Sequence, residues 1–309
     1  MKIFTDFENA GFIKNAVVTT GSFDGVHRGH KVILQRLKKL AFETGGETVL
    51  ITFHPHPRKV LFPDTIGKEL FLLNSQQEKI ELLRKAGLDN LIIVNFTLAF
   101  SRITSVDFVK NILLNKIHAK KIVIGGNHHF GHNREGDSEK MHQLGLEYGF
   151  EVEEIPEQDI QNEFISSAKI RTALLEGNIE KANTYLAHPY IIMGELQGVN
   201  PLLTESGFPV FSVRIEEESK LIPKDGVYAV SVLDNENLYH GLCFIKKNGL
   251  LSNEAVVEFY LFDRPAELSG TTATVLFHKF IREIMNFASP EELKAQLMID
   301  QSQVDDLIF

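Results

Sequence analysis

Over the first 186 residues, two patterns of hydrophobic positions follow each other repeatedly. Short apolar runs are typical of strands, and apolar positions three and four residues apart are typical of helices, so the chain is predicted to form strands and helices in turn. Short apolar runs rich in β-branched residues predict strands at residues 16–20, 48–53, 91–94, 121–125 and 151–155. Apolar positions three and four residues apart predict helices at residues 32–41, 76–86, 104–114, 141–148, 167–175 and 179–186. This alternation predicts an α/β fold with an open parallel sheet, in which ligands bind at the carboxyl ends of the strands.

The pattern changes near residue 189. Strand-like runs follow at residues 190–196, 208–215, 227–233, 238–245, 255–261 and 272–277, with turn signals between them. Regular short strands of this kind predict a small antiparallel β-barrel. Ser289 and Pro290, followed by two acidic residues, predict the start of a C-terminal helix. We therefore expect two domains, residues 1–187 and residues 188–309.

Length and composition agree with this division and argue against several classes of protein. A chain of 309 residues suits two domains, and a net charge of −9 gives no support to nonspecific nucleic-acid binding. No apolar run reaches the roughly 18 residues that span a bilayer, and the N-terminus has no secretory pattern. The single cysteine, Cys243, excludes an intrachain disulfide and suits a reducing compartment. We expect a cytoplasmic protein with no membrane or nucleic-acid partner.

The most informative motif is the glycine-rich segment at residues 21–30, between the first predicted strand and the first predicted helix. Such a turn leaves backbone N–H groups beside the positive end of the helix dipole, where phosphate binds. Gly21 and Gly25 let the backbone approach a ligand, and Gly29 permits close packing where the helix begins. His27 and His30 are suited to stabilise charge on a phosphoryl group. The alternative is an ordinary strand-to-helix turn with two surface histidines.

A second motif occupies residues 52–58, at the end of the strand predicted at residues 48–53. Two prolines stiffen this loop. Its phenylalanine and histidines are suited to face a flat ring, and Arg58 is suited to lie near a phosphate. A rigid turn after a strand explains the same residues equally well.

The loop after the strand at residues 121–125 is rich in glycine, asparagine and histidine. Glycine and asparagine suit tight backbone turns beside a ligand. Together with His142, its histidines invite a metal-site interpretation, but His128 and His129 are adjacent and the spacing matches no standard zinc pattern. A loop that contacts a nucleotide, with Asn127 along it, is the preferred interpretation, and no metal site is predicted.

A fourth motif begins the helix predicted at residues 167–175. Ser166 and Ser167 are expected to cap this helix, and its first turn presents Lys169 and Arg171. The capping hydroxyls, the positive end of the helix dipole and the two cationic side chains would all lie at the start of this helix, which suits the binding of a polyphosphate. A plain capped helix is the alternative for this motif alone.

Together the four motifs resemble one family, the prokaryotic bifunctional riboflavin kinase/FAD synthetase, over nearly the whole chain. Residues 21–30 resemble its form of the HxGH nucleotidyltransferase signature, and residues 52–58 resemble its Phe-x-Pro-His-Pro loop. Residues 125–137 resemble its Gly-x-(Asp/Asn)-Phe-x-Phe-Gly…Arg-x-Gly-Asp segment, which Arg134, Gly136 and Asp137 fit, with His128 where phenylalanine is usual. Residues 166–171 resemble its Ser-Ser-Thr-x-Ile-Arg motif, with Ala168 in place of threonine.

The resemblance implies a Rossmann-like nucleotidyltransferase domain followed by a riboflavin kinase-like barrel. It implies adenylyl transfer from ATP, bound with Mg²⁺, to FMN, giving FAD and pyrophosphate. The catalytic residues that it implies are His27, His30 and Arg171. The ATP-binding residues are Gly21, Ser22, Phe23, Asp24, Gly25, Asn127, Ser166 and Ser167. The flavin-binding residues are Phe53, His54, Pro55, His56, Pro57 and Arg58.

The C-terminal half resembles the kinase, whose substrate is riboflavin, only in outline. Where the family has Gly-Phe-Pro-Thr-Ala-Asn, residues 207–212 are Gly-Phe-Pro-Val-Phe-Ser, and Val210 offers no oxygen to Mg²⁺. Glu205 stands where a cation is expected, and residues 244–249 replace the family's Gly-x-Arg-Pro-Thr segment. Glu258 stands at the position of the family's catalytic base. We expect weak or absent riboflavin kinase activity.

Two other hypotheses stay open. One is a nucleotidyltransferase with a different acceptor, because the motif at residues 21–30 recognises ATP rather than flavin. The other is a paralogue that binds flavin or nucleotide without turnover, which the altered kinase motifs and Ala168 favour.

Overall fold

The computed structural model describes residues 1–126, 128–156, 159–160, 163–197, 209–247, 255–262, 268 and 270–308. By its internal contacts the chain forms two compact units. The first unit comprises Met1–Leu70 and Lys79–Ile165, and the second comprises Phe71–Glu78 and Ser166–Phe309. Residues 71–78 and 166–187 thus group with the second unit, whereas the domain boundary expected from the sequence lies at residue 187.

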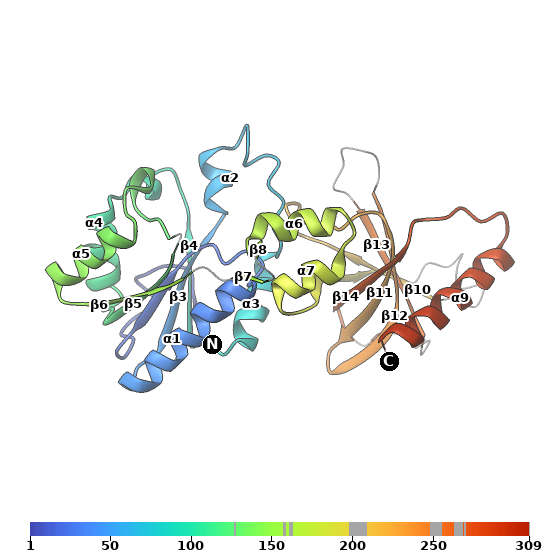
Figure 1. Ribbon diagram of the computed structural model, residues 1–309, viewed down its shortest axis with the longest axis horizontal. Coiled ribbons are helices and arrows are strands. Elements are labelled where there is room, and N and C mark those ends of the chain that lie inside the picture. The colour runs from blue at the N-terminus through green and yellow to red at the C-terminus, as the bar shows by residue number, and fades with distance from the viewer. Residues whose placement is uncertain are drawn as a thin grey trace. The chain divides into compact units, whose positions relative to one another are not determined.

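The first unit is built on a six-stranded sheet with the order β1-β4-β3-β2-β5-β6 (Figure 1). Its strands are β1 (Lys2–Phe4), β2 (Val17–Thr20), β3 (Thr48–His54), β4 (Asn90–Asn95), β5 (Lys121–Gly125) and β6 (Glu151–Ile155). All neighbouring strands run parallel, which confirms the predicted sheet. The edge strand β1 was not predicted, because three residues are too few to show a period.

Helices cover both faces of this sheet. One face packs against α1 (Arg28–Thr44) and the second half of α3 (Gln76–Lys85), where Leu37 and Leu83 meet Leu50 of β3. The other face packs against the π-helical segment η2 (Phe108–Leu114) and α5 (Ser138–Tyr148), where Val109 and Met141 meet Ile51. The shorter elements are α2 (Pro57–Leu61), η1 (Phe100–Arg102), α4 (Ser105–Asp107), η3 (His132–Arg134), β7 (Asp159–Ile160) and β8 (Glu163–Phe164).

The second unit contains a closed antiparallel barrel with the order β10-β13-β12-β11-β14-β9, which confirms the predicted barrel. Its strands are β9 (Tyr190–Gln197), β10 (Val210–Arg214), β11 (Gly226–Asp234), β12 (Asn237–Lys247), β13 (Ala255–Leu261) and β14 (Thr272–Arg282). The unit also contains α6 (Ser167–Leu175), α7 (Ile179–Leu186) and the C-terminal α9 (Pro290–Ile308). Leu297 and Val304 of α9 pack against Val227 and Leu242 on the outside of the barrel.

Candidate active site

The loop between β2 and α1, residues 21–27, has an unusual backbone. Gly25 has φ +91°, and the non-glycine residues Phe23 and Val26 have φ +47° and +41°. A left-handed conformation costs a non-glycine residue on the order of 1–3 kcal/mol, and it is least expected for a β-branched residue such as Val26. Both side chains are buried, with 2% and 0% exposure, so core packing holds the loop in this shape. Backbone strain maintained by the core is typical of a site that presents its backbone to a ligand.

The first turn of α1 is suited to an anion. His27 occupies its N-cap without a side-chain capping hydrogen bond, and the first turn contains no acidic residue. In the described helix, no side-chain cap therefore accepts hydrogen bonds from the N-terminal N–H groups, and no carboxylate in the first turn balances the positive end of the dipole. A phosphate group would satisfy both.

His27 and His30 lie against each other at this helix start. Their ring centroids are 3.6 Å apart with 19° between the planes, and Phe23 stacks on His30 at 4.4 Å. Within the described part of the chain, the buried Nδ1 of His30 has no hydrogen-bond partner. Burial, with smaller effects of His27 and Lys79, holds the pKa of His30 well below its usual 6.5. His30 is therefore neutral near pH 7 and keeps one N–H to donate to a phosphoryl oxygen.

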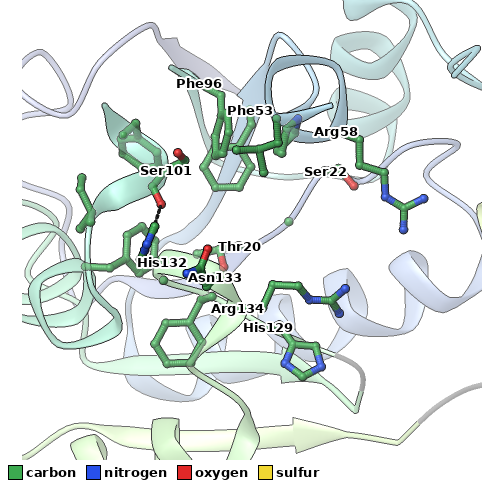
Figure 2. Close-up of a pocket in the computed structure, with 18 of the residues that line it drawn as sticks. Thr20, Ser22, Phe53, Arg58, Phe96, Ser101, His129, His132, Asn133 and Arg134 are labelled. Atoms are coloured by element: carbon green, nitrogen blue, oxygen red, sulfur yellow. Dashed lines mark hydrogen bonds between the residues drawn. The ribbon is translucent and has the colours of Figure 1, made fainter. Parts of the chain in front are cut away.

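A cavity of about 740 Å³ opens at the carboxyl ends of β2, β3, β4 and β5 (Figure 2). One wall consists of phenylalanine rings. The centroid of Phe53 lies 5.5 Å from that of Phe96 and 5.9 Å from that of Phe100. Phe108 contacts Phe100 at 6.4 Å, and Phe130 follows at 6.3 Å from Phe108. A wall of aromatic rings suits a flat, largely apolar ring as ligand.

Basic side chains line another part of the same cavity. Figure 2 shows Arg58, His129 and Arg134 there, apart from the phenylalanine rings. No acidic residue is among the described lining residues. Neither guanidinium forms an ion pair with a carboxylate of the described residues. Guanidinium groups without a carboxylate partner, beside an aromatic wall, are suited to a ligand that carries both a ring and a phosphate.

A strained loop holds Arg134 at the cavity. Gly131, Asn133 and Arg134 have φ +77°, +52° and +60°, a conformation that is uncommon for arginine. The carboxylate of the next residue, Glu135, accepts a hydrogen bond from the backbone N–H of Ser105 at 2.6 Å. The loop is therefore tied to the start of α4, and the arginine is presented from a fixed backbone.

The histidines of this loop do not converge. Nε2 of His128 lies 3.3 Å from Oγ1 of Thr20, whereas Nδ1 of His132 lies 3.0 Å from the carbonyl oxygen of Ser101. Within the described residues, no group of three or more histidine, cysteine or carboxylate side chains is placed to hold a metal ion. Burial, with a smaller effect of His129, lowers the pKa of His128 to about 4.

Four of the six residues that the sequence associates with flavin line the cavity. These are Phe53, His56, Pro57 and Arg58, whereas His54 and Pro55 do not line it. Nδ1 of His56 accepts a hydrogen bond from the backbone N–H of Arg58 at 3.2 Å and so caps α2. The loop at residues 52–58 is thus both a defined turn and part of the cavity lining.

The residues that the sequence associates with ATP belong to both units. Gly21 and Ser22 line the cavity, whereas Phe23 and Asp24 are buried. Gly25 is buried in the same strained loop. Asn127 lies outside the described residues.

The remaining two ATP-associated residues, Ser166 and Ser167, lie at the start of α6 in the second unit, and Arg171, predicted as catalytic, lies within the same helix. Ser166 is the N-cap of this helix, and its Oγ accepts a hydrogen bond from the backbone N–H of Lys169 at 3.3 Å. Ser167 is the first residue of α6. Nε of Arg171 donates a hydrogen bond to the carbonyl oxygen of Phe71 at 2.7 Å.

In the barrel, Glu258 of β13 lies opposite Ser212 of β10 and Phe244 of β12. Opposite residues of paired strands share a face, so these side chains lie on one side of the barrel wall. Val210 and Phe244 belong there to an apolar cluster that includes Leu297 of α9. On this face, Glu258 and Ser212 therefore lie beside apolar side chains. Residues 200–205, 207–208 and 248–249 lie outside the described part of the chain.

Several residues that line the cavity were not predicted as site residues from the sequence. Phe96, Phe100 and Phe108 were not singled out, nor were His129 and Arg134 given a role at the site. Residues 96–108 directly follow β4, and the carboxyl ends of parallel strands share one edge of a sheet. That rule, applied to β4, would have found the aromatic wall.

A glycine-rich loop between a central strand and α1 defines the class of α/β proteins that bind ligands at the carboxyl edge of a parallel sheet. The FAD synthetase family model matches residues 11–169, and the riboflavin kinase family model matches residues 186–308. The chain therefore belongs to the bifunctional riboflavin kinase/FMN adenylyltransferase family.

Individual relatives agree with this assignment. The chain is 34% identical to a bifunctional riboflavin kinase/FMN adenylyltransferase of Listeria monocytogenes, over 93% of this chain and 90% of that protein. It is 31% identical to a protein of the same description from Escherichia coli, over 93% of this chain and 91% of that protein. A crystal structure described as a macrolide-efflux protein from Streptococcus pneumoniae has a TM-score of 0.86 at 25% identity, with 99% of both chains covered.

Among the helices that the structure describes here, none has both the length and the apolar character to cross a bilayer.

Proposed function

We propose that this chain is an FMN adenylyltransferase, which joins AMP from ATP to the phosphate of FMN and so makes FAD. The observation that carries the proposal is the cavity beside Gly21 and Ser22, which combines a phenylalanine wall with Arg58 and Arg134. FMN has the matching parts, a flat ring system and a terminal phosphate. Membership of the family with an FAD synthetase domain supports the same function.

In the proposed reaction, a phosphate oxygen of FMN attacks the α-phosphorus of ATP. The bond between that phosphorus and the bridging oxygen to the β-phosphate breaks, and pyrophosphate leaves with the bonding electrons. Mg²⁺ enters as part of the ATP substrate. Because no covalent enzyme intermediate is needed, the protein accelerates the reaction by positioning the substrates and neutralising charge.

We assign His27 and His30 to the phosphoryl oxygens on which charge builds in the transition state. The negative charge of the triphosphate favours the protonated form of His30 and so opposes the burial that lowers the pKa of this residue. The backbone at residues 21–25 and Asn127 follow the nucleotide in this proposal. The β- and γ-phosphates are assigned to Ser166, Ser167 and Arg171.

The flavin ring is assigned to the wall around Phe53, with His56 and Pro57 beside it. Arg58 and Arg134 are assigned to the FMN phosphate, because both line the cavity without a described carboxylate partner. His54 and Pro55 form part of the same loop. Stacking fixes the ring and the guanidinium groups fix the phosphate, so the nucleophilic oxygen is oriented from both ends.

We further propose that the barrel transfers phosphate to riboflavin weakly or not at all. Glu258 provides a base, but its neighbours Val210 and Phe244 belong to an apolar cluster. Mg²⁺ requires oxygen ligands, and on this part of the face Ser212 offers one hydroxyl. We also infer a cytoplasmic location, to which the buried free thiol of Cys243 is suited.

The test uses the full-length protein with FMN, ATP and Mg²⁺ and measures FAD and pyrophosphate. We expect both products in equal amounts from the wild type and a loss of at least about a hundredfold in the His27→Ala/His30→Ala double variant. His142→Ala, on the exposed surface of α5, is the matched control and should retain full activity. An unchanged rate in the double variant would contradict the assignment of these histidines.

The same preparation separates the alternatives. Pyrophosphate release with another acceptor, but not with FMN, would indicate a different nucleotidyltransferase. Tight FMN binding without pyrophosphate release would indicate a binding protein. Robust formation of FMN from riboflavin and ATP would refute the loss of kinase activity.

A further inference from the structure

Residues 71–78 form a short segment of the second unit that is hydrogen-bonded to the barrel side of that unit. The N–H of Leu72 donates to the carbonyl oxygen of Ser219 at 2.6 Å, and the N–H of Leu221 donates to the carbonyl oxygen of Leu72 at 2.8 Å. The N–H of Gln76 donates to a carboxylate oxygen of Glu217 at 2.7 Å. The segment is therefore paired with residues 217–221, which lie between β10 and β11.

Lys220 is the centre of this attachment. Its side chain is fully buried, and its ammonium donates to Oε2 of Glu78 at 2.6 Å, to the carbonyl oxygen of Leu73 at 2.6 Å and to that of Ile191 at 2.8 Å. The ammonium also lies 4.2 Å from the ring centre of Tyr190. An ammonium has three donors, so these three acceptors match its capacity. Lys220 thus joins both ends of the segment 73–78 to β9.

Both carboxylate oxygens of Glu78 also accept hydrogen bonds. It is fully buried, its Oε1 accepts a hydrogen bond from the N–H of Met193 at 2.8 Å, and its Oε2 accepts one from the N–H of Ser75 at 2.9 Å. The N–H of Glu78 in turn donates to Oγ of Ser75 at 3.2 Å, so the two residues form a capping box at the start of α3. A buried carboxylate of this kind needs its cation, because removing one partner leaves an uncompensated charge.

The other end of the segment holds Arg171. The carbonyl oxygen of Phe71 accepts the hydrogen bond from Nε of this arginine at 2.7 Å. A bond to Nε fixes the plane of a guanidinium. Because a guanidinium binds phosphate through directional, bidentate hydrogen bonds, its plane decides how well it binds.

We propose that Lys220 is a positioning residue for adenylyl transfer. It anchors residues 71–78, and the anchored Phe71 carbonyl orients Arg171 toward the phosphates of ATP. The proposal rests on the proposed function, in which Arg171 holds the β- and γ-phosphates. It gives the barrel a part in FAD synthesis that does not depend on kinase chemistry.

The experiment compares Lys220→Met with Arg282→Met in the full-length protein. Arg282 is the matched control, because it also pairs with a fully buried carboxylate, Asp300, at 2.7 Å, and touches none of residues 71–78 in its described contacts. We expect Lys220→Met to raise the KM for Mg·ATP about tenfold and to leave the KM for FMN unchanged. Arg282→Met should leave both unchanged at temperatures where the variants are folded.

A double-variant cycle identifies the route of the effect. If Lys220 acts through Arg171, adding Lys220→Met to Arg171→Ala should weaken ATP binding no further, as measured by calorimetry. Equal effects of Lys220→Met and Arg282→Met, or effects of Lys220→Met and Arg171→Ala that multiply, would overturn the positioning role. Glu78→Gln keeps the size of the side chain, but it replaces one acceptor oxygen with an NH2 donor and removes the charge that pairs with Lys220. It is the second variant if Lys220→Met does not fold, and the same expectations apply to it.

The cycle also separates this proposal from the proposed function. Normal FAD formation and ATP binding by Arg171→Ala would contradict the assignment of Arg171 itself. A large loss in Arg171→Ala, with no change in Lys220→Met, would overturn only the positioning role of Lys220.

Discussion

Replacing His128 with phenylalanine, the residue that the family usually has at this position, should make the first unit less sensitive to acid. Burial, with a smaller effect of His129, lowers the pKa of His128 from 6.5 to about 4. In the unfolded chain the pKa is ordinary, so the unfolded state takes up the proton first as the pH falls. The contribution of the neutral histidine to stability is complete above pH 6.5 and is lost progressively down to about pH 4.

The size of the effect follows from the same numbers. One pKa unit corresponds to about 1.4 kcal/mol, so protonating His128 in the folded state costs about 3 kcal/mol of unfolding free energy. In a domain of about 150–250 residues this corresponds to roughly 6–12 °C in Tm. His128→Phe also removes the contact of 3.3 Å between Nε2 and Oγ1 of Thr20, which lowers stability by about 1 kcal/mol at every pH.

The measurement is thermal unfolding of both proteins at a series of pH values from about 7.5 to about 4. The wild type should be slightly more stable at neutral pH, and the variant should be more stable at the acidic end, so the two curves cross. His142→Phe, on the exposed surface of α5, is the control and should leave the pH dependence of the wild type unchanged. Parallel curves for wild type and His128→Phe would refute the reasoning.

Three further changes test the cavity. Gly131 has φ +77°, and Gly131→Ala puts a Cβ 2.6 Å from the backbone nitrogen of Ser105. The variant should lower the unfolding free energy, measured by urea denaturation, by more than about 1 kcal/mol. An unchanged unfolding free energy would contradict the tight packing of this loop. Phe53→Ala removes the ring that contacts Phe96 and Phe100 and should raise the KM for FMN about tenfold while the KM for ATP stays constant; a change confined to ATP would place the flavin elsewhere. Arg134→Ala should weaken FMN binding roughly 10–100-fold in fluorescence titration but leave riboflavin binding unchanged, since riboflavin has no phosphate; equal losses for both ligands would exclude a phosphate contact.

Local patterns were enough to predict most of the fold. The predicted helices at residues 167–175 and 179–186 coincide with α6 and α7, because caps and apolar spacing mark their ends. Short elements such as β1 and α2 were not predicted, because they have too few residues to show a hydrophobic period. The helix predicted at residues 104–114 exists as α4 followed by the π-helical η2, a change of hydrogen bonding that apolar spacing does not reveal.

The site was predictable as motifs but not as contacts. Glycines and histidines marked the loop at residues 21–30, yet the left-handed conformation of Val26 runs against the preference of a β-branched residue and could not be expected. The contacts of Arg171 with Phe71 and of Lys220 with Glu78 join positions 100 and 142 residues apart, and no local period records such pairs. Tertiary packing alone brings them together.

The chain passes between its two units three times, after residues 70, 78 and 165. A gene truncated after β6 would therefore lose the barrel but retain residues 71–78, and the carboxylate of Glu78 would lose its buried cation. No single recombination junction exchanges one unit for a foreign one without leaving a piece of the other behind. In the proposed loss of kinase activity, point substitutions such as those at Val210 and Ser212 would be enough, and the barrel would still be inherited with the rest of the chain.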